Sequence, residues 1–267
     1  MRGMTATLAP PLVSLTDVHK SFSGASKRSA PRQALRGFDL TVAEGEFFCL
    51  LGPSGCGKST LMNLVAGFLE PDVGEILVAG ERVTGPGSDR GVLFQTPALF
   101  PWMTTLQNVM YGPRAAHAPK AESLDAAHHL LETVGLGDAK DSYPHELSGG
   151  MRHRAAFARV LINKPRLLLM DEPFGALDSI TRAAMQDFLL ELWQRGRTTI
   201  IFVTHDVEEA VLLADRICVM SPDPEAEQGL YFDVDLPRPR DHSITETLEF
   251  VTLKRKVRQS LEAITHT

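Results

Sequence analysis

An octapeptide between an apolar segment and a helical segment most constrains what this chain can fold into. Residues 52–59 read Gly-Pro-Ser-Gly-Cys-Gly-Lys-Ser, which fits the pattern G-x-x-x-x-G-K-[ST] at every position. An apolar segment, 46–51, precedes it, and residues 58–66 have a helical pattern that ends at Gly67. A strand, a glycine-rich turn and a helix in this order predict a loop that wraps around phosphate groups.

The residue types in this loop suit the phosphates of a nucleotide. Glycines let backbone N–H groups point inward, and the helix N-terminus adds partial positive charge. We expect Lys58 to reach the β- and γ-phosphates, Ser59 to ligate Mg²⁺ and Thr60 to help hold the α-phosphate. A purely structural turn is the alternative, and the complete match disfavours it. The predicted ATP-binding residues here are Gly52, Pro53, Ser54, Gly55, Cys56, Gly57, Lys58, Ser59 and Thr60.

A second element places two carboxylates after an apolar strand. Residues 167–172 read Leu-Leu-Leu-Met-Asp-Glu, and the C-terminal ends of strands are where open α/β sheets bind ligands. We expect Asp171 to hold Mg²⁺, directly or through water, and Glu172 to act as general base on the attacking water. A buried strand with an ordinary acidic turn would look the same, but the phosphate loop upstream favours a nucleotide site.

Length, charge and cysteine usage exclude several classes of protein. The 267 residues suffice for one large domain or two small ones. The net charge of −6 argues against nucleic-acid binding, which usually shows a basic footprint. Three scattered cysteines favour a reduced, cytosolic compartment. No apolar run approaches the ~18–20 residues of a membrane-spanning helix, and no secretory signal is evident, so we expect a membrane role only through a partner.

The order of elements predicts an α/β fold. Segments 12–22 and 33–42 alternate like paired strands, with an exposed basic loop expected at 23–32. The middle of the chain is helical, at 121–134 and 149–162. Strands and helices then alternate from residue 166 to residue 220, which predicts a parallel sheet covered on both faces.

Residues 147–154, Leu-Ser-Gly-Gly-Met-Arg-His-Arg, resemble the LSGGQ signature of the ABC ATPases. Further marks follow in the family's order, namely Phe22, Gln95 after Val92-Leu93-Phe94, residues 174–178 (Phe-Gly-Ala-Leu-Asp) and residues 203–206 (Val-Thr-His-Asp). The resemblance covers residues 12–221. His153 departs from it, because the signature usually continues with glutamine there.

The resemblance implies a P-loop NTPase (RecA-like) core with a parallel sheet, an N-terminal antiparallel β subdomain and an inserted α-helical subdomain. The ABC ATP-binding domain would span residues 12–236, with the helical subdomain at about 96–162. Residues 237–267 would form a C-terminal tail. The tail has an amphipathic pattern with apolar Leu248, Val251, Val257 and Leu261, so it is expected to be helical. Packing on the core, bracing a dimer and a solvated helix remain open.

The resemblance also implies that two subunits face head to tail and enclose two ATP molecules. Each ATP would lie on the phosphate loop of one subunit and beneath the signature of the other, Leu147, Ser148, Gly149, Gly150 and Met151. Phe22 would stack on adenine, and Asp178 of the D-loop would communicate across the dimer. The implied catalytic residues are Glu172, His205 and Gln95, and the implied metal ligands are Ser59, Gln95 and Asp171. Taken alone, each of these residues could instead be an ordinary core, surface or helix-capping residue.

A finer resemblance indicates the kind of transporter. Residues 85–95, 99–102, 171–182 and 203–210 look like the nitrate, sulfonate and taurine importer group. It implies an ATPase subunit that forms half of a homodimer on the cytoplasmic side of the cell membrane. It would drive uptake of a small oxyanion through a separate permease, indirectly served by a periplasmic or surface solute-binding protein.

Residues 96–111 would dock the permease through the apolar Leu99, Phe100, Trp102 and Met103, unless these side chains fill the helical subdomain. Three other functions compete with an importer ATPase. A soluble ABC ATPase acting on nucleic acid or ribosomes would be expected to have a tandem second domain and a basic surface. A P-loop kinase would lack the signature. A regulatory subunit that only binds ATP would not need Glu172 and His205.

Overall fold

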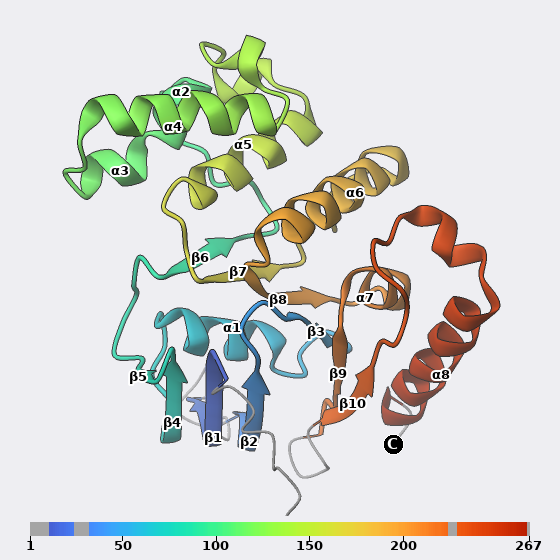
Figure 1. Cartoon of the computed structure of the whole chain (residues 1–267). Coiled ribbons are helices and arrows are strands. Elements are labelled where there is room, and N and C mark those ends of the chain that lie inside the picture. Colours follow the sequence, from blue (N-terminus) through green and yellow to red (C-terminus); the bar gives the residue numbers. More distant parts are fainter. Residues whose placement is uncertain (1–10, 24–31, 224–228, 266–267) are drawn as a thin grey trace, which may run out of the picture.

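The computed structural model describes residues 11–23, 32–223 and 229–265. Two β-sheets are stacked with a helix between them, and a helical lobe projects from one edge (Figure 1). The expected fold class is confirmed, because a mainly parallel sheet and an N-terminal antiparallel sheet are both present. Within the described residues, no helix has the length and apolar character needed to span a bilayer.

The larger sheet carries the site. Its strand order is β10-β9-β3-β8-β7-β6, and all neighbours are parallel except β10, which runs antiparallel to β9. Its strands are β3 (Phe47–Leu51), β6 (Arg90–Leu93), β7 (Leu167–Asp171), β8 (Thr199–Thr204), β9 (Arg216–Met220) and β10 (Gly229–Asp233). Both β3 and β8 are buried along their whole length, as continuous apolar runs predict for strands covered on both faces.

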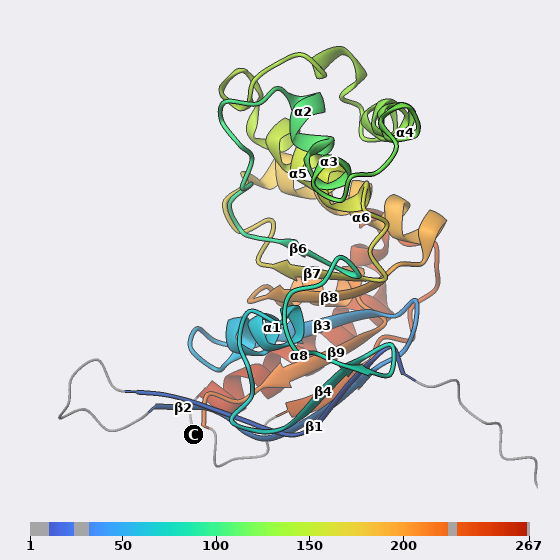
Figure 2. The same cartoon turned by 90° about the vertical axis from the view of Figure 1, so that its left-hand side faces the viewer.

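The smaller sheet is antiparallel, with the order β2-β1-β4-β5. It comprises β1 (Val13–Phe22), β2 (Arg32–Val42), β4 (Val73–Val78) and β5 (Glu81–Arg82). The predicted pairing of the first two segments is confirmed, and the body of the basic loop, 24–31, lies outside the described residues. Helix α1 (Lys58–Ala66) lies between the two sheets and shares one apolar core with both (Figure 2).

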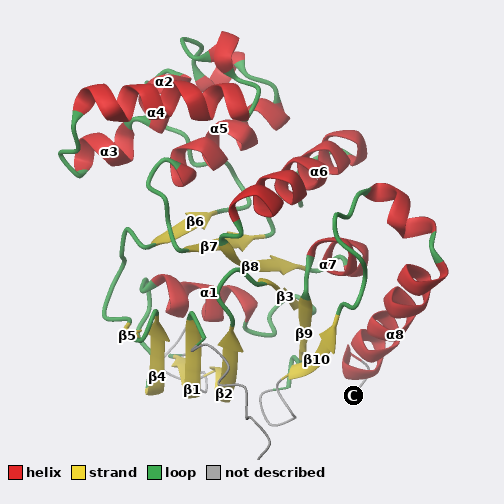
Figure 3. Ribbon diagram, in the orientation of Figure 1, coloured by secondary structure: helices red, strands yellow, loops and turns green. Residues whose placement is uncertain are grey.

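Apart from α1 and the C-terminal helix, the helices fall into two groups (Figure 3). Between β6 and β7 lie α2 (Thr105–Val109), α3 (Tyr111–Ala115), α4 (Lys120–Thr133) and α5 (Gly149–Leu161), with the 3-10 turns η1 (Gly137–Ala139) and η2 (Pro144–Glu146). They form the projecting lobe and bury a core of their own. Helices α6 (Ser179–Gly196) and α7 (Val207–Leu213) cover the other face of the larger sheet.

The C-terminal segment packs on the core rather than standing in solvent. After the 3-10 turn η3 (His242–Glu246), helix α8 (Leu248–Thr265) contacts α7 and β9 and fully buries Phe250 and Val257. The assignment of Leu248 and Val251 to the apolar side is wrong, because they are 76% and 40% exposed. Phe250, which the sequence interpretation left out, sets the buried side instead. Strand β10 was also not predicted.

Two arginines tie this segment to the core. The buried guanidinium of Arg240 donates hydrogen bonds to carbonyl oxygens at the end of α7 and after β10, those of Val211, Leu212, Ala214, Val234 and Leu236. Burial lowers the pKa of Arg240 to about 10, so the group is still a cation at neutral pH. Arg238 pairs with Asp215 at 2.8 Å and lies 4.3 Å from the ring of Trp193.

We predict that Arg240→Ala lowers the free energy of unfolding by about 3 kcal/mol, because it leaves several buried carbonyl oxygens without their donor. Urea denaturation followed by circular dichroism measures this. Arg255→Ala, at an exposed position on α8, is the control and should leave the midpoint unchanged. Equal stability of the two variants would contradict a stabilising role for the Arg240 hydrogen bonds.

Candidate nucleotide-binding site

The predicted phosphate loop connects the end of β3 to the start of α1. Gly55 and Gly57 have φ values of 85° and 103°, which favour glycine. A Cβ atom at Gly57 would lie 2.7 Å from the carbonyl oxygen of Ala34, so a side chain there has no room. Gly57 caps α1 without a side-chain hydrogen bond, so the N–H groups of the first turn can face an anion.

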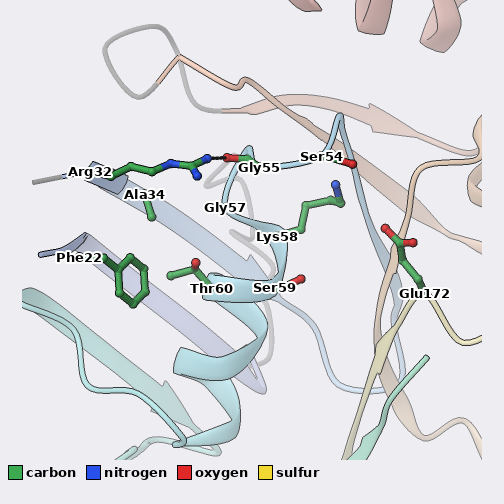
Figure 4. Close-up of a pocket in the computed structure, with 10 residues that line it drawn as sticks. All are labelled: Phe22, Arg32, Ala34, Ser54, Gly55, Gly57, Lys58, Ser59, Thr60 and Glu172. Carbon is green, nitrogen blue, oxygen red and sulfur yellow. Dashed lines mark hydrogen bonds between the residues drawn. The ribbon is translucent and has the colours of Figure 1, made fainter. Parts of the chain in front are cut away.

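A pocket of about 310 Å³ lies over this loop (Figure 4). Phe22 and Glu172 stand at its opposite ends, with the start of α1 between them. Its lining residues are Phe22, Arg32, Ala34, Ser54, Gly55, Gly57, Lys58, Ser59, Thr60 and Glu172. An aromatic ring, a phosphate loop and a carboxylate therefore lie in this order along one cavity. A nucleotide would need the same order for its nucleobase, its phosphate chain and the water that attacks the last phosphate.

The Lys58 ammonium is held over the loop by the loop's own backbone. Its Nζ atom donates to the carbonyl oxygens of Gly52 at 2.7 Å and Pro53 at 2.9 Å. The side chain is buried, and its charge is satisfied within the loop. Gly52, Pro53 and Cys56, also predicted to bind ATP, are not among the residues that line the pocket.

Arg32 is a site residue that the motif search missed. It begins β2, and its Nη2 atom donates to the carbonyl oxygen of Gly55 at 2.8 Å. The basic segment 23–32 was interpreted as an exposed loop, but this last residue faces the pocket. No motif links Arg32 to the phosphate loop, since the two meet only through the packing of the smaller sheet. Ala34 enters the pocket in the same way.

Asp171 and Ser59 meet beside the loop. Burial raises the pKa of the Asp171 carboxyl, and a hydrogen bond from the Ser59 side chain opposes that shift. Asp171 ends β7 and Ser59 lies in the first turn of α1, so two elements far apart in sequence bring a carboxylate and a hydroxyl together. Such oxygen ligands are those that Mg²⁺ prefers, and the pair therefore fits this ion.

Glu172 has an unusual backbone for its residue type. Its φ of 46° lies in the left-handed region, which is costly for a residue with a side chain. Its N–H donates to the carbonyl oxygen of Val203 at 3.0 Å, so the neighbouring strand β8 supports this conformation. Backbone strain that the surrounding structure maintains is typical of functional sites. The conformation turns the carboxylate toward the pocket (Figure 4).

His205 and Gln95 approach Glu172 from two other strands. His205 follows β8, and its Nδ1 atom lies 3.2 Å from Oε2 of Glu172. Gln95 is exposed after β6, and both its amide nitrogen and the Glu172 carboxylate lie within 4 Å of a Cβ position built on Gly175. His205 therefore contacts Glu172 directly, and Gln95 lies near it beside Gly175, although neither is a lining residue of the pocket itself.

The predicted signature and D-loop lie around a different cavity, of about 610 Å³. Ser148 accepts a hydrogen bond from the Met151 N–H and starts α5, and Asp178 accepts from the N–H groups of Ile180 and Thr181 and starts α6. Gly149 and Gly150 line the same cavity, while Leu147 is buried and Met151 is half-buried. None of its lining residues belongs to the phosphate loop.

His153 lies on the buried side of α5. It lines a small pocket with Thr96, Pro97 and Ala98, the residues that follow Gln95. Burial lowers the pKa of the imidazole, and the neighbouring Arg152 charge adds to this. The side chain is therefore neutral at pH 7, as a glutamine would be.

A parallel sheet with a phosphate loop after one strand and paired acids after another defines a P-loop nucleotide-binding ATPase. A family model described as "ABC transporter" matches residues 35–175, and the chain belongs to this family. The expected membership of the ABC ATPase family is thereby confirmed. The chain is an ATPase whose hydrolysis is coupled to transport.

Two relatives and one solved structure show the extent of the similarity. The chain is 51% identical over 192 residues to the taurine import ATP-binding protein TauB of Roseobacter denitrificans, covering 72% of each chain. It is 46% identical over 241 residues to the nitrate import ATP-binding protein NrtD of Synechocystis, covering 88% and 90%. A dimeric ATP-binding cassette in a post-hydrolysis state with ADP and Pi superposes with a TM-score of 0.71 at 28% identity, covering 84% of this chain and 100% of that one.

We predict that His153→Gln keeps the ATPase kcat within about threefold of native between pH 6.5 and 8, since a neutral side chain replaces a neutral side chain. A pKa lowered by folding means that the unfolded chain takes up the proton first, so the native protein loses stability as pH falls below about 6.5. The variant lacks this loss and should be relatively more stable at pH 5.5 in thermal denaturation. A loss of activity beyond tenfold would contradict the prediction.

Proposed function

We propose that this chain is the ATP-hydrolysing subunit of an importer for a small oxyanion, and that it works as a head-to-tail pair beneath a membrane permease. The observation that carries the proposal is the separation of the two phosphate-binding motifs. The phosphate loop lines one cavity, and the signature glycines line another. A single chain therefore offers half of a site in each place, and two copies facing each other complete both.

Within one subunit, the pocket binds ATP along its length. Phe22, 38% exposed at one end, stacks on adenine, while the loop N–H groups and Lys58 hold the phosphates. Arg32 adds a second positive charge on the side facing β2, and Thr60 supports the α-phosphate. The γ-phosphate then lies toward Glu172, at the opposite end from the ring.

Ser59 and Asp171, with Gln95 as the third predicted ligand, would hold Mg²⁺ between the phosphate loop and the end of β7. The ion, when bound, neutralises charge that develops on the phosphates during hydrolysis. The hydrogen bond between Ser59 and Asp171 supports this assignment, because the two oxygen ligands already lie together.

Glu172 is the general base in this proposal. It takes a proton from the water that attacks the γ-phosphate, and the left-handed backbone aims its carboxylate at the pocket. His205, 3.2 Å from that carboxylate, contacts the γ-phosphate and holds the base in position. Gln95, on the other side of Gly175, orients the water and begins the segment that leads to the helical lobe.

The second subunit completes the site. Ser148, Gly149 and Gly150 stand at the start of α5, where N–H groups and the helix dipole favour an anion. Asp178 at the start of α6 shares that cavity, so the D-loop would meet the facing subunit at the same place. The similarity to a cassette solved as a dimer with ADP and Pi supports this arrangement.

The relatives support the direction and the class of cargo. TauB is named for taurine import and NrtD for nitrate import, and both cargoes carry an oxyanion group. We assign this chain to the cytoplasmic side of a membrane on the same basis, with a solute-binding protein on the far side of the permease.

The docking surface proposed for the permease lies after Gln95. The ring centroid of Phe100 lies 5.6 Å from that of Trp102 and 4.5 Å from that of Tyr111, and Trp102 is 69% exposed. Leu99 instead packs into the core, so the predicted cluster divides between a buried base and an exposed face. An exposed tryptophan that packs on the ring of Phe100, which Tyr111 supports in turn, is typical of a protein-binding surface.

For Glu172→Gln we predict a fall in kcat of about 100-fold or more and a stable dimer in the presence of ATP, because the amide cannot accept the water's proton. Size-exclusion chromatography with ATP and steady-state phosphate release measure the two effects. Glu191→Gln, at an exposed position on α6, is the matched control. A monomeric Glu172→Gln protein with native turnover would contradict both the base and the paired site.

We further predict that Trp102→Ala reduces uptake by the assembled transporter about tenfold, while kcat and KM for ATP of the isolated chain stay within twofold. Trp102 is not among the residues that line the nucleotide pocket, so only the coupling of hydrolysis to uptake should suffer. Leu248→Ala, another exposed apolar side chain, should leave both readouts unchanged. Equal losses of uptake and of ATP turnover would count against the docking surface.

A further inference from the structure

A buried carboxylate on α7 has no role in the function proposed so far. Glu209 is only 6% exposed. The residues that follow it on this short helix are all apolar and buried. An ionised carboxylate in such a place is costly unless it is hydrogen-bonded. Burial raises the pKa of Glu209, and the hydrogen bond from Thr204 opposes this shift.

Both oxygens of Glu209 accept hydrogen bonds from other elements. Oε2 accepts from the Thr204 hydroxyl at 2.6 Å, and Oε1 accepts from the Gln186 amide nitrogen at 3.0 Å. All three side chains are buried. Charged groups facing the carboxylate are Asp206, which raises its pKa, and Arg182 of α6, which lowers it. The carboxylate thus joins the end of β8, helix α6 and helix α7 at one point.

The Thr204 hydroxyl fixes the turn that presents His205. It donates to Glu209 and accepts from the Asp206 N–H at 3.0 Å, so it spans the residues on both sides of His205. The His205 side chain is itself 63% exposed, and the contact found for it among the described residues is with Glu172. Its position therefore depends mainly on the backbone that Thr204 holds.

The Gln186 contact reaches the D-loop. Gln186 lies in α6, the helix whose first turn Asp178 caps. A displacement of α6 against the sheet would alter the Gln186–Glu209 hydrogen bond, and with it the support of Thr204. Glu209 is therefore placed between the element expected at the subunit interface and the residue expected at the γ-phosphate.

We propose that Glu209 is a positioning residue for ATP hydrolysis, which acts through Thr204 to hold His205 and through Gln186 to link that histidine to the D-loop helix. This inference rests on the proposed role of His205. A merely structural role for Glu209 predicts a loss of stability alone. A positioning role predicts a loss of kcat with little change in KM for ATP, because the phosphate loop is untouched.

The first test uses two threonines on one strand. Thr204→Val removes the hydroxyl with little change in shape, and we expect kcat to fall at least tenfold with KM for ATP within twofold of native. Thr199, at the other end of β8, is equally buried and accepts a hydrogen bond from the Gly45 N–H at 2.8 Å. Thr199→Val should lower the unfolding temperature comparably but keep kcat within twofold.

The second test separates hydrogen bonding from charge. In Glu209→Gln the new side-chain carbonyl oxygen can still accept from the Thr204 hydroxyl. The new amide nitrogen can donate to the amide oxygen of Gln186 once the Gln186 amide group rotates, so at least a third of kcat should remain. Glu209→Ala should lose at least tenfold, and Gln186→Ala should lose activity in the same direction. The double variant Thr204→Val with His205→Ala should be no more than twofold slower than His205→Ala alone, since both act through one histidine.

The outcomes distinguish the inference from the proposed function. If His205→Ala loses its activity while Thr204→Val and Glu209→Ala stay within twofold of native, the inference is overturned and the role of His205 stands. If His205→Ala keeps native kcat, both are overturned. An equal loss of kcat in Thr199→Val would show a stability effect and overturn the inference. Should Thr204→Val fail to fold, the contrast between Glu209→Gln and Glu209→Ala decides.

Discussion

The close fit between the phosphate loop and the smaller sheet is the contact on which the site depends. Gly57 can pass the backbone of Ala34 only because it has no side chain, and Arg32 of the same strand holds the carbonyl oxygen of Gly55. Helix α1 then lies between the two sheets and buries apolar residues against both. The stacking of the sheets thus sets the direction of α1, and α1 sets where a phosphate can bind.

Much of this arrangement could be predicted from sequence, because its signals are local. The apolar runs of β3 and β8, the glycine pattern of 52–59 and the carboxylates after β7 lie within short windows, and the predicted helix at 58–66 coincides with α1. The meeting of Ser59, Asp171 and Glu172 followed from the rule that parallel strands present their C-terminal ends at one edge.

What could not be predicted arises from contacts between distant segments. Arg32 reaches the pocket through the pairing of β1 with β2, and no motif records that. Strand β10 is short, half-exposed and antiparallel to its neighbour, and its sequence lacks the long apolar run that predicted the central strands. The buried face of α8 depends on which side meets α7, and four apolar residues fitted more than one face. The hydrogen bonds that Glu209 accepts from Gln186 and Thr204 depend on the packing of α6, α7 and β8, which no local sequence pattern records.

The location of the two phosphate-binding motifs in separate cavities has a genetic consequence. In the proposed pair, one site combines the loop of the first subunit with the signature of the second, and the other site combines the reverse. A subunit with a damaged loop and a subunit with a damaged signature would each be inactive as a homodimer. Mixed together, they would concentrate both defects in one site and leave the other entirely intact, so two inactive alleles would complement each other.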